Sequence, residues 1–296
     1  MPVPSTVDYV APGSPTVPEA SATVTDRWRR PLLVLVAFEL AVVFTPTVAW
    51  LWDRWTLSVW HNAHGMFVPP LAGWLAWQEL KAHPNVPVGS SRWGYALLVP
   101  ALVLHALDAG MHTQLLSAAA LFVAIAGLAL LTLGTARTRL IAFPLAFLVF
   151  AIPIPLALTE PLHLVLRQFA AAGSAALLPV LGVSVFREGT VLHTAVGPVT
   201  IVDACSGFST LYASLAVASL AAYGATGWGR RALVFLSVAP IALGANLLRV
   251  VVLIVLVLWY GWGVLDTFLH PLSGMVTFAL ALPVIFWLGG PARQST

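Results

Sequence analysis

The sequence predicts an all-α polytopic membrane protein with about eight transmembrane helices, an external amphipathic helix and a short β-hairpin. Composition is the first observation, since 59% of the 296 residues are hydrophobic and only 8% are charged. The mean hydropathy of +0.92 is far above that of a soluble domain of this length. A formal net charge of +3 is too small to indicate a nucleic-acid partner. The expected surrounding is therefore a lipid bilayer.

Residues 1–30 form the first predicted segment, rich in Pro, Ser, Thr and Val. Such a composition buries too little apolar surface to offset its ordering entropy, which predicts a disordered cytoplasmic tail. The apolar stretch that follows is too long for a signal-peptide core and has no small-residue cleavage site, so it predicts an uncleaved first span. Residues 31–290 are expected to form a single transmembrane domain, and residues 291–296 a short cytoplasmic tail.

The apolar runs define the predicted spans, because a helix that crosses a bilayer needs about 20 such residues. The predicted spans are 31–52, 66–80, 93–108, 114–134, 140–157, 206–223, 232–258 and 269–288. Residues 160–182 are also apolar, but they contain His163 and Arg167. The stretch 186–198 has the pattern of short strands and turns.

The basic residues decide how the segment 160–182 is placed. If this segment lies on the outer surface, cytoplasmic segments hold ten of the fourteen basic residues. If it crossed the membrane, Arg230 and Arg231 would lie outside, against the positive-inside bias. The charge distribution therefore predicts an external amphipathic helix at 160–182 and places both termini in the cytoplasm.

The only cysteine of the chain, Cys205, lies in a polar cluster at the start of an apolar segment. A single cysteine forms no intrachain disulfide, so it is either a small core residue or a reactive thiol. Ser206 and Gly207 allow a tight turn into the following helix, and a thiol near a helix N-terminus has its thiolate stabilised by unpaired N–H groups. This setting favours a reactive thiol.

Two further polar residues occur in apolar runs. Arg249, in Asn246-Leu-Leu-Arg249, is flanked by Leu and Val residues, and an ionisable residue inside a span is a functional-site hypothesis by default. His270 begins the last apolar run. The predicted topology places Cys205 and His270 at the outer interface, because both begin spans that enter from outside.

Five motifs in order carry a family resemblance: His64-Gly65, the Pro-punctuated run 143–155, Ala204-Cys-Ser-Gly207, Asn246-x-x-Arg249, and a His at the start of the last span. Together they resemble the exosortase/archaeosortase family of membrane transpeptidases, over roughly residues 60 to 280. The resemblance implies a multi-pass protein of the bacterial inner membrane with its active site on the external side. It also implies that Cys205, Arg249 and His270 are the catalytic set, and that no cofactor is needed.

The resemblance further implies the substrate, a secreted protein with a C-terminal sorting signal. That signal has three parts: a short motif such as Pro-Glu-Pro, a single apolar helix and a basic tail. The acceptor is an unknown amine, glycan or lipid.

The residue types allow acyl transfer. A Cys205 thiolate attacks a peptide carbonyl to form a thioester, His270 moves the proton, and Arg249 holds the thiolate or the developing oxyanion. Ser206, Gly207 and Asn246 are expected to support this set. Asp203 either orients Arg249 or His270 or caps the helix that follows. His64 either contacts substrate or is an external loop residue.

Alternative readings remain open. Arg249 could pair with an acid such as Asp203 or Asp266 only to join two spans. In a transporter it would be a substrate counter-charge, but that class predicts inverted repeats, and no convincing repeat is found. A hydrolase that releases its peptide to water is not distinguished from a transpeptidase.

His105, Asp108 and His112 fall on one helical face. They are either metal ligands or an interface cluster, and the interface cluster is the preferred interpretation.

Overall fold

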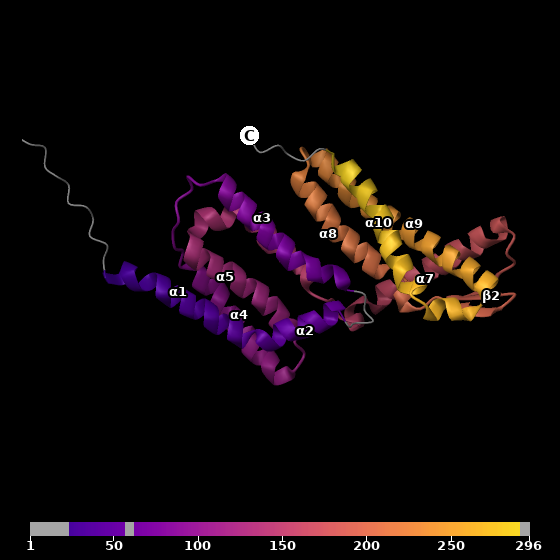
Figure 1. Cartoon of the computed structure of the whole chain (residues 1–296), viewed down its shortest axis with the longest axis horizontal. Helices are drawn as coiled ribbons and strands as arrows, with labels where there is room; N and C mark the ends of the chain where they lie inside the picture. Colours follow the sequence, from indigo (N-terminus) through magenta and orange to yellow (C-terminus); the bar gives the residue numbers. More distant parts are fainter. Residues whose placement is uncertain (1–23, 57–61, 291–296) are drawn as a thin grey trace, which may run out of the picture. The chain divides into compact units, whose positions relative to one another are not determined.

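Figure 1 shows the computed structural model, which describes residues 24–56 and 62–290. The predicted tails fall largely on 1–23 and 291–296, outside the described residues. Helix α1 (Val24–Val43) begins within the stretch predicted as N-terminal tail. The chain divides into two compact units, one ending at Val43 and one beginning at Phe44. The single domain expected at 31–290 stays a prediction.

The second unit begins with a set of helices and one 3₁₀ turn: α2 (Thr45–Thr56), η1 (Ala63–Phe67), α3 (Val68–Ala82), α4 (Trp93–Met111) and α5 (Leu115–Leu140). Helices α4 and α5 approach closely at two glycines, since a Cβ added to Gly94 would lie 2.6 Å from the carbonyl oxygen of Gly127. Small residues at such positions allow helix backbones to come together in a membrane. The pair forms a compact hairpin.

The turn between α4 and α5 explains the His105, Asp108 and His112 pattern. Asp108 is fully buried and accepts hydrogen bonds from the Ser117 backbone N–H (2.8 Å) and from the Thr113 hydroxyl. His105 shares a hydrogen bond of 2.9 Å with the Ser117 hydroxyl. Among the described residues, no group of three His, Cys, Asp or Glu side chains is placed to hold a metal ion. The cluster joins two helices.

The predicted span 140–157 is not one continuous helix in the structure. It consists of α6 (Ala142–Phe147) and the 3₁₀ turn η2 (Leu148–Ala151), followed by non-helical residues up to Pro155. This helical piece by itself is too short to cross a ~30 Å core. The reason is Pro153 and Pro155, which lack an N–H group and disfavour helix in the residue before each of them.

The segment predicted as an external amphipathic helix is α7 (Leu156–Leu177), which continues into the 3₁₀ turn η3 (Leu178–Leu181). Residues Ala157–Leu181 have the length and hydropathy of a membrane span. Five helices in the described part of the chain pass this test, or six when the interrupted pair Val34–Val43 and Thr45–Thr56 counts as one span. The expected number of eight spans is not confirmed, because α3 and α8 have only 15 and 17 residues and α6 is shorter still.

A small antiparallel sheet follows α7, made of β1 (Phe186–Glu188), β2 (Val191–Thr194) and β3 (Gly197–Thr200) in that order. Glu188 pairs with Val191 and Thr194 pairs with Gly197, so both connections are tight turns. The predicted hairpin is confirmed and is extended by a third strand.

The last part of the chain contains η4 (Asp203–Cys205), α8 (Phe208–Gly224), α9 (Trp228–Tyr260), η5 (Trp262–Asp266) and α10 (Leu269–Gly289). Helices α8, α9 and α10 lie side by side (Figure 1). Buried residues of α7, the sheet and the second half of α9 form one core, which includes Ala170, Ala171, Leu192, Val199, Val250 and Ile254. Cys205 packs against this core, so the core positions the segment that carries the thiol.

Candidate active site

The turn that carries Cys205 lies just before α8. Cys205 is the last residue of η4, and Gly207 precedes α8 with φ of 87°. A residue with a side chain rarely adopts such a positive φ, and a Cβ on Gly207 would also lie 2.6 Å from Asn246 Cγ. The predicted tight turn is confirmed, although Cys205 precedes the helix instead of beginning it.

Asn246 joins this turn to α9. Its side chain is 2% exposed, and its Nδ2 donates a hydrogen bond of 3.0 Å to the Cys205 carbonyl oxygen. Asn246 and Arg249 are three residues apart, so they share one face of α9. The same helix face therefore supports the Cys205 backbone and presents the arginine.

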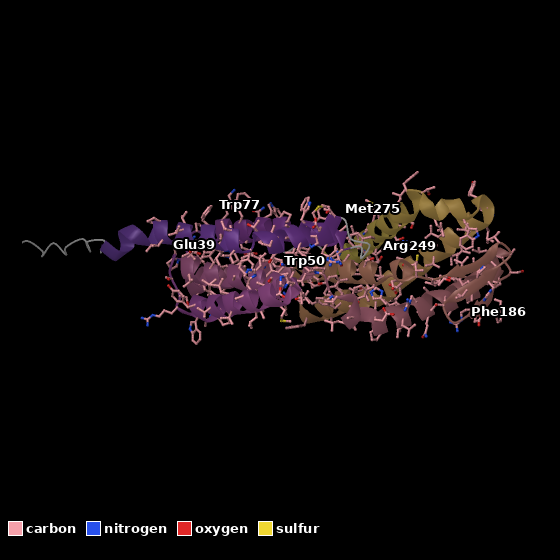
Figure 2. All side chains as sticks on the ribbon, turned by 90° about the horizontal axis from the view of Figure 1, so that it is seen from below. Glu39, Trp50, Trp77, Phe186, Arg249 and Met275 are labelled. Carbon is pink, nitrogen blue, oxygen red and sulfur yellow. The ribbon has the colours of Figure 1, made fainter. Side chains whose placement is uncertain are left out.

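Arg249, labelled in Figure 2, is 6% exposed. Its Nε donates a hydrogen bond of 2.9 Å to the Ser273 hydroxyl of α10, and its guanidinium lies against Gly274. It also interacts electrostatically with Cys205. The sequence did not single out Ser273, because nothing in a serine near the start of an apolar run indicates its partner.

The charge state of Cys205 reflects two opposing effects. Burial raises the pKa of the Cys205 thiol, and the positive charge of Arg249 lowers it, with burial the larger effect. The net pKa lies above the ordinary value, so the resting side chain is a neutral thiol at neutral pH. A base must take its proton when the thiolate is needed.

The backbone of His270 lies in the first turn of α10, and its side chain lies outside what the structure describes. Ser273 and Gly274 of the same helix contact Arg249. The first turns of α10 therefore adjoin the site, and the catalytic role of His270 stays a prediction. The side chain of Asp266, one proposed partner of Arg249, is likewise outside the described set.

Asp203 has a different partner from those predicted. Its Oδ1 lies 2.8 Å from Nη1 of Arg167 on α7, and Arg167 also pairs with Glu160 at 2.9 Å. The expectation that Asp203 orients or pairs with Arg249 gives way to this ion pair. The sequence could not show it, because 36 residues separate the two partners and their contact depends on how α7 packs.

Helix α7 makes a second contact with the Cys205 turn. His163 Nδ1 lies 3.0 Å from the Ser206 hydroxyl, and both residues are buried, at 8% and 1% exposed. His163 and Arg167 are four residues apart on one helix face. That spacing is the one sequence signal that predicts a shared role for them.

His64 and Gly65 lie beside α8 and η2. The His64 ring meets the Tyr212 ring edge-on, with centroids 5.1 Å apart, and Gly65 packs directly under the Trp55 indole. Trp55 Nε1 donates to the Ala151 carbonyl at 2.9 Å, and the Tyr212 hydroxyl donates to the Val149 carbonyl at 3.2 Å. These side chains hold η2, so the early His-Gly pair and the Pro-punctuated run meet in space. Substrate contact by His64 stays a prediction.

The fold and the site define a helical membrane protein in which a partly buried thiol interacts with a buried arginine. Residues 52–287 match the family described as transmembrane exosortase (Exosortase_EpsH). The chain belongs to the transmembrane exosortase family, which confirms the family predicted from the motifs. This is a family of membrane-embedded proteases and transpeptidases that process sorting signals. No curated protein and no solved structure matches the chain.

Proposed function

We propose that the protein is a cysteine-dependent transpeptidase that cleaves C-terminal sorting signals of secreted proteins. The observation that carries this proposal is the convergence on Cys205 of two groups from one face of α9: Asn246 holds its carbonyl and Arg249 acts on its thiol electrostatically. A structural cysteine needs neither group. A nucleophile needs a fixed backbone and a positive charge near the sulfur.

The reaction follows from these groups. The Cys205 thiol loses its proton to His270, and the sulfur attacks the scissile carbonyl carbon. The C–N bond then breaks, the leaving amine takes the proton from His270, and a thioester to Cys205 remains. An acceptor amine or hydroxyl attacks this thioester and releases the thiol. Arg249 stabilises the thiolate and the oxyanion, since a guanidinium stays charged when it is buried.

The proposed substrates are secreted proteins whose C-terminal signal has a short Pro-Glu-Pro-like motif, an apolar helix and a basic tail. The helix of such a signal would lie in the bilayer beside the enzyme, with its basic tail in the cytoplasm. The scissile bond would then lie at the outer face of the bacterial inner membrane. The acceptor is an amine, a glycan or a lipid.

The first experiment tests the nucleophile. We expect both Cys205→Ala and Cys205→Ser to abolish cleavage of a membrane-anchored reporter with a tripartite signal. Alanine has no nucleophilic atom, and a serine hydroxyl stays protonated without a stronger base. The measurement is cleavage per folded molecule, with Thr226→Ala in the exposed loop before α9 as the control. Wild-type cleavage by Cys205→Ala would refute the proposal.

A second measurement tests whether the reaction passes through a thioester that an added nucleophile can intercept. Hydroxylamine is a strong small nucleophile, so it should intercept the thioester and release the reporter as a hydroxamate, which mass spectrometry identifies. Release of only the free acid in the presence of hydroxylamine would indicate that the intermediate reacts with water alone.

A further inference from the structure

Helix α7 holds the Cys205 turn at two points. Ser206, the residue after Cys205, shares a 3.0 Å hydrogen bond with His163, and Asp203, two residues before it, pairs with Arg167 at 2.8 Å. With the Asn246 bond to the Cys205 carbonyl, the backbone around the thiol is held before, at and after the nucleophile. Two of these three attachments come from α7, a helix without any of the proposed catalytic residues Cys205, Arg249 and His270.

We propose that His163 is a positioning residue for the nucleophile, acting through Ser206. The proposal rests on the proposed function, because a fixed thiol matters only if the thiol reacts. A small misplacement of a reacting atom slows a reaction strongly, so a side chain that fixes the Cys205 turn contributes to the rate without touching substrate.

The surroundings of His163 indicate that its hydrogen bond, and not its bulk, is the important property. Its ring stacks at a tilt on Phe208, with centroids 4.6 Å apart, a contact that an apolar aromatic ring also makes. Burying a polar imidazole in place of an apolar ring is unfavourable unless the polar atoms are paired. Ser206 supplies that pairing, and its oxygen also accepts the Phe208 N–H at 3.3 Å at the start of α8.

The charged groups near His163 attach the same turn more loosely. Asp203 Oδ1 is 3.9 Å from His163 Nδ1 and 2.8 Å from Arg167 Nη1, and Arg167 also binds Glu160. The Asp203 and Glu160 side chains are 39% and 49% exposed, so water and salt weaken these ion pairs. The buried bond between His163 and Ser206 is therefore the attachment to test.

The test compares His163→Asn with His163→Phe in the full-length protein in detergent. Asparagine keeps a hydrogen-bonding atom near the position of Nδ1, whereas phenylalanine keeps only the ring. With the tripartite reporter, we expect His163→Phe to lower kcat per folded molecule about 10- to 100-fold. KM should stay within about twofold, since positioning of the nucleophile does not alter substrate binding. His163→Asn should retain kcat within about threefold of wild type.

The control is His193→Phe, which removes an exposed histidine that pairs with Glu188 at 3.1 Å on the sheet. It should leave kcat and KM unchanged. Ser206→Ala removes the same hydrogen bond from its other end. The double variant with His163→Phe should therefore have a kcat no lower than that of the slower single variant.

Two results would overturn the inference. Wild-type kcat per folded molecule in His163→Phe would show that the bond only supports folding. Equal failure of His163→Asn and His163→Phe would show that the imidazole itself transfers a proton. If His163→Phe does not fold, Ser206→Ala is tested in its place, and a wild-type kcat per folded molecule in that variant would overturn the inference.

The inference can be separated from the proposed function with a measurement that needs no substrate. Iodoacetamide should alkylate Cys205 faster in His163→Phe and in Ser206→Ala, because a released turn exposes the thiol, and the double variant should add nothing further. Unchanged alkylation in both single variants would contradict the positioning role. This result does not depend on whether Cys205→Ala cleaves the reporter.

Discussion

At the scale of single residues, the site depends on how Arg249 is held. Its Nε donates a hydrogen bond to the Ser273 hydroxyl, and its positive charge acts on the Cys205 thiol. A lysine at position 249 would lack the planar guanidinium with its several N–H donors. It would also lose its proton more readily at a buried site. The arginine therefore provides both orientation and charge.

Removal of the charge at residue 249 should change how Cys205 ionises. Because Arg249 lowers the pKa of the Cys205 thiol, Arg249→Met should raise that pKa further, and iodoacetamide should react more slowly at pH 8. The midpoint of the pH–rate curve for alkylation measures the effect, with Arg230→Met, near the other end of α9, as the control. We also expect a loss of cleavage of about 10²- to 10³-fold, comparable to losing an oxyanion donor. An unmoved midpoint would reject the electrostatic role.

His64 provides a test at acidic pH. Burial lowers the pKa of His64 from 6.5 to about 4, so the folded protein keeps it neutral while the unfolded chain protonates it below pH 6.5. The contribution of His64 to the free energy of unfolding should therefore keep its full value above pH 6.5 and fall as the pH drops towards 4. At pH 5 the loss attributable to His64 is about 2 kcal/mol. Thermal unfolding in detergent at pH 7 and pH 5 should show a smaller difference for His64→Gln than for wild type, and an equal difference would contradict the burial of a neutral imidazole.

At the scale of elements, the important contact is between the turn before α8 and the face of α9. Gly207 lies at the closest approach, with Asn246 directly against its Cα. Another glycine offers a close comparison, since Gly182, at the end of η3, has φ of 80°, ψ of 11° and open space around it, while Gly207 has φ of 87° and ψ of 4°. The two positions share the backbone requirement and differ only in their surroundings.

Alanine at the two glycines should separate backbone strain from the steric contact. Both Gly207→Ala and Gly182→Ala incur the cost of the left-handed conformation, about 1 kcal/mol. Gly207→Ala should in addition displace Asn246, release the Cys205 carbonyl and abolish most cleavage per folded molecule, whereas Gly182→Ala should cleave normally. Equal activity of the two variants would show that the contact with Asn246 does not matter to the site.

At the scale of the whole molecule, the placement of α7 sets the membrane topology. The predicted sides of α5 and of the sheet require one crossing between them, made either by the interrupted segment 140–157 or by α7. The packing favours the segment 140–157. Helix α7 contacts α9 from Leu247 onwards, which is roughly 28 Å along the helix from Trp228 at 1.5 Å per residue. With Trp228 at the inner boundary, α7 lies at the outer edge of a ~30 Å core.

Cysteine labelling tests this placement in intact cells, in a Cys205→Ala background. A membrane-impermeant maleimide should label cysteines at Glu188 and at Val165, which lies on an exposed face of α7, but not at Thr226 or Leu236. Leu236 is 76% exposed on the first half of α9, where lipid should cover it. Protection of Val165 together with labelling of Glu188 would place α7 inside the bilayer. Labelling of Thr226 alone would reverse the orientation.

The sequence by itself determined the class of protein, the short strands before the cysteine and the tight turn at Gly207. These follow from local properties: hydropathy over about 20 residues, proline and glycine positions, and the order of short motifs. It also identified Cys205, Asn246 and Arg249, which the structure brings together. The extent of the helices near Pro153 and Pro155 was less predictable, because apolar composition alone does not show where a helix breaks.

Only the tertiary structure decided which polar groups pair. The contacts of His163 with Ser206, of Arg167 with Asp203 and of Arg249 with Ser273 join residues that are 43, 36 and 24 positions apart. No local pattern encodes such pairs, since each depends on how two helices or a helix and a turn pack together. For the same reason the role of Asp203 was left open between orienting Arg249 or His270 and capping a helix, and no part in the site was expected of α7.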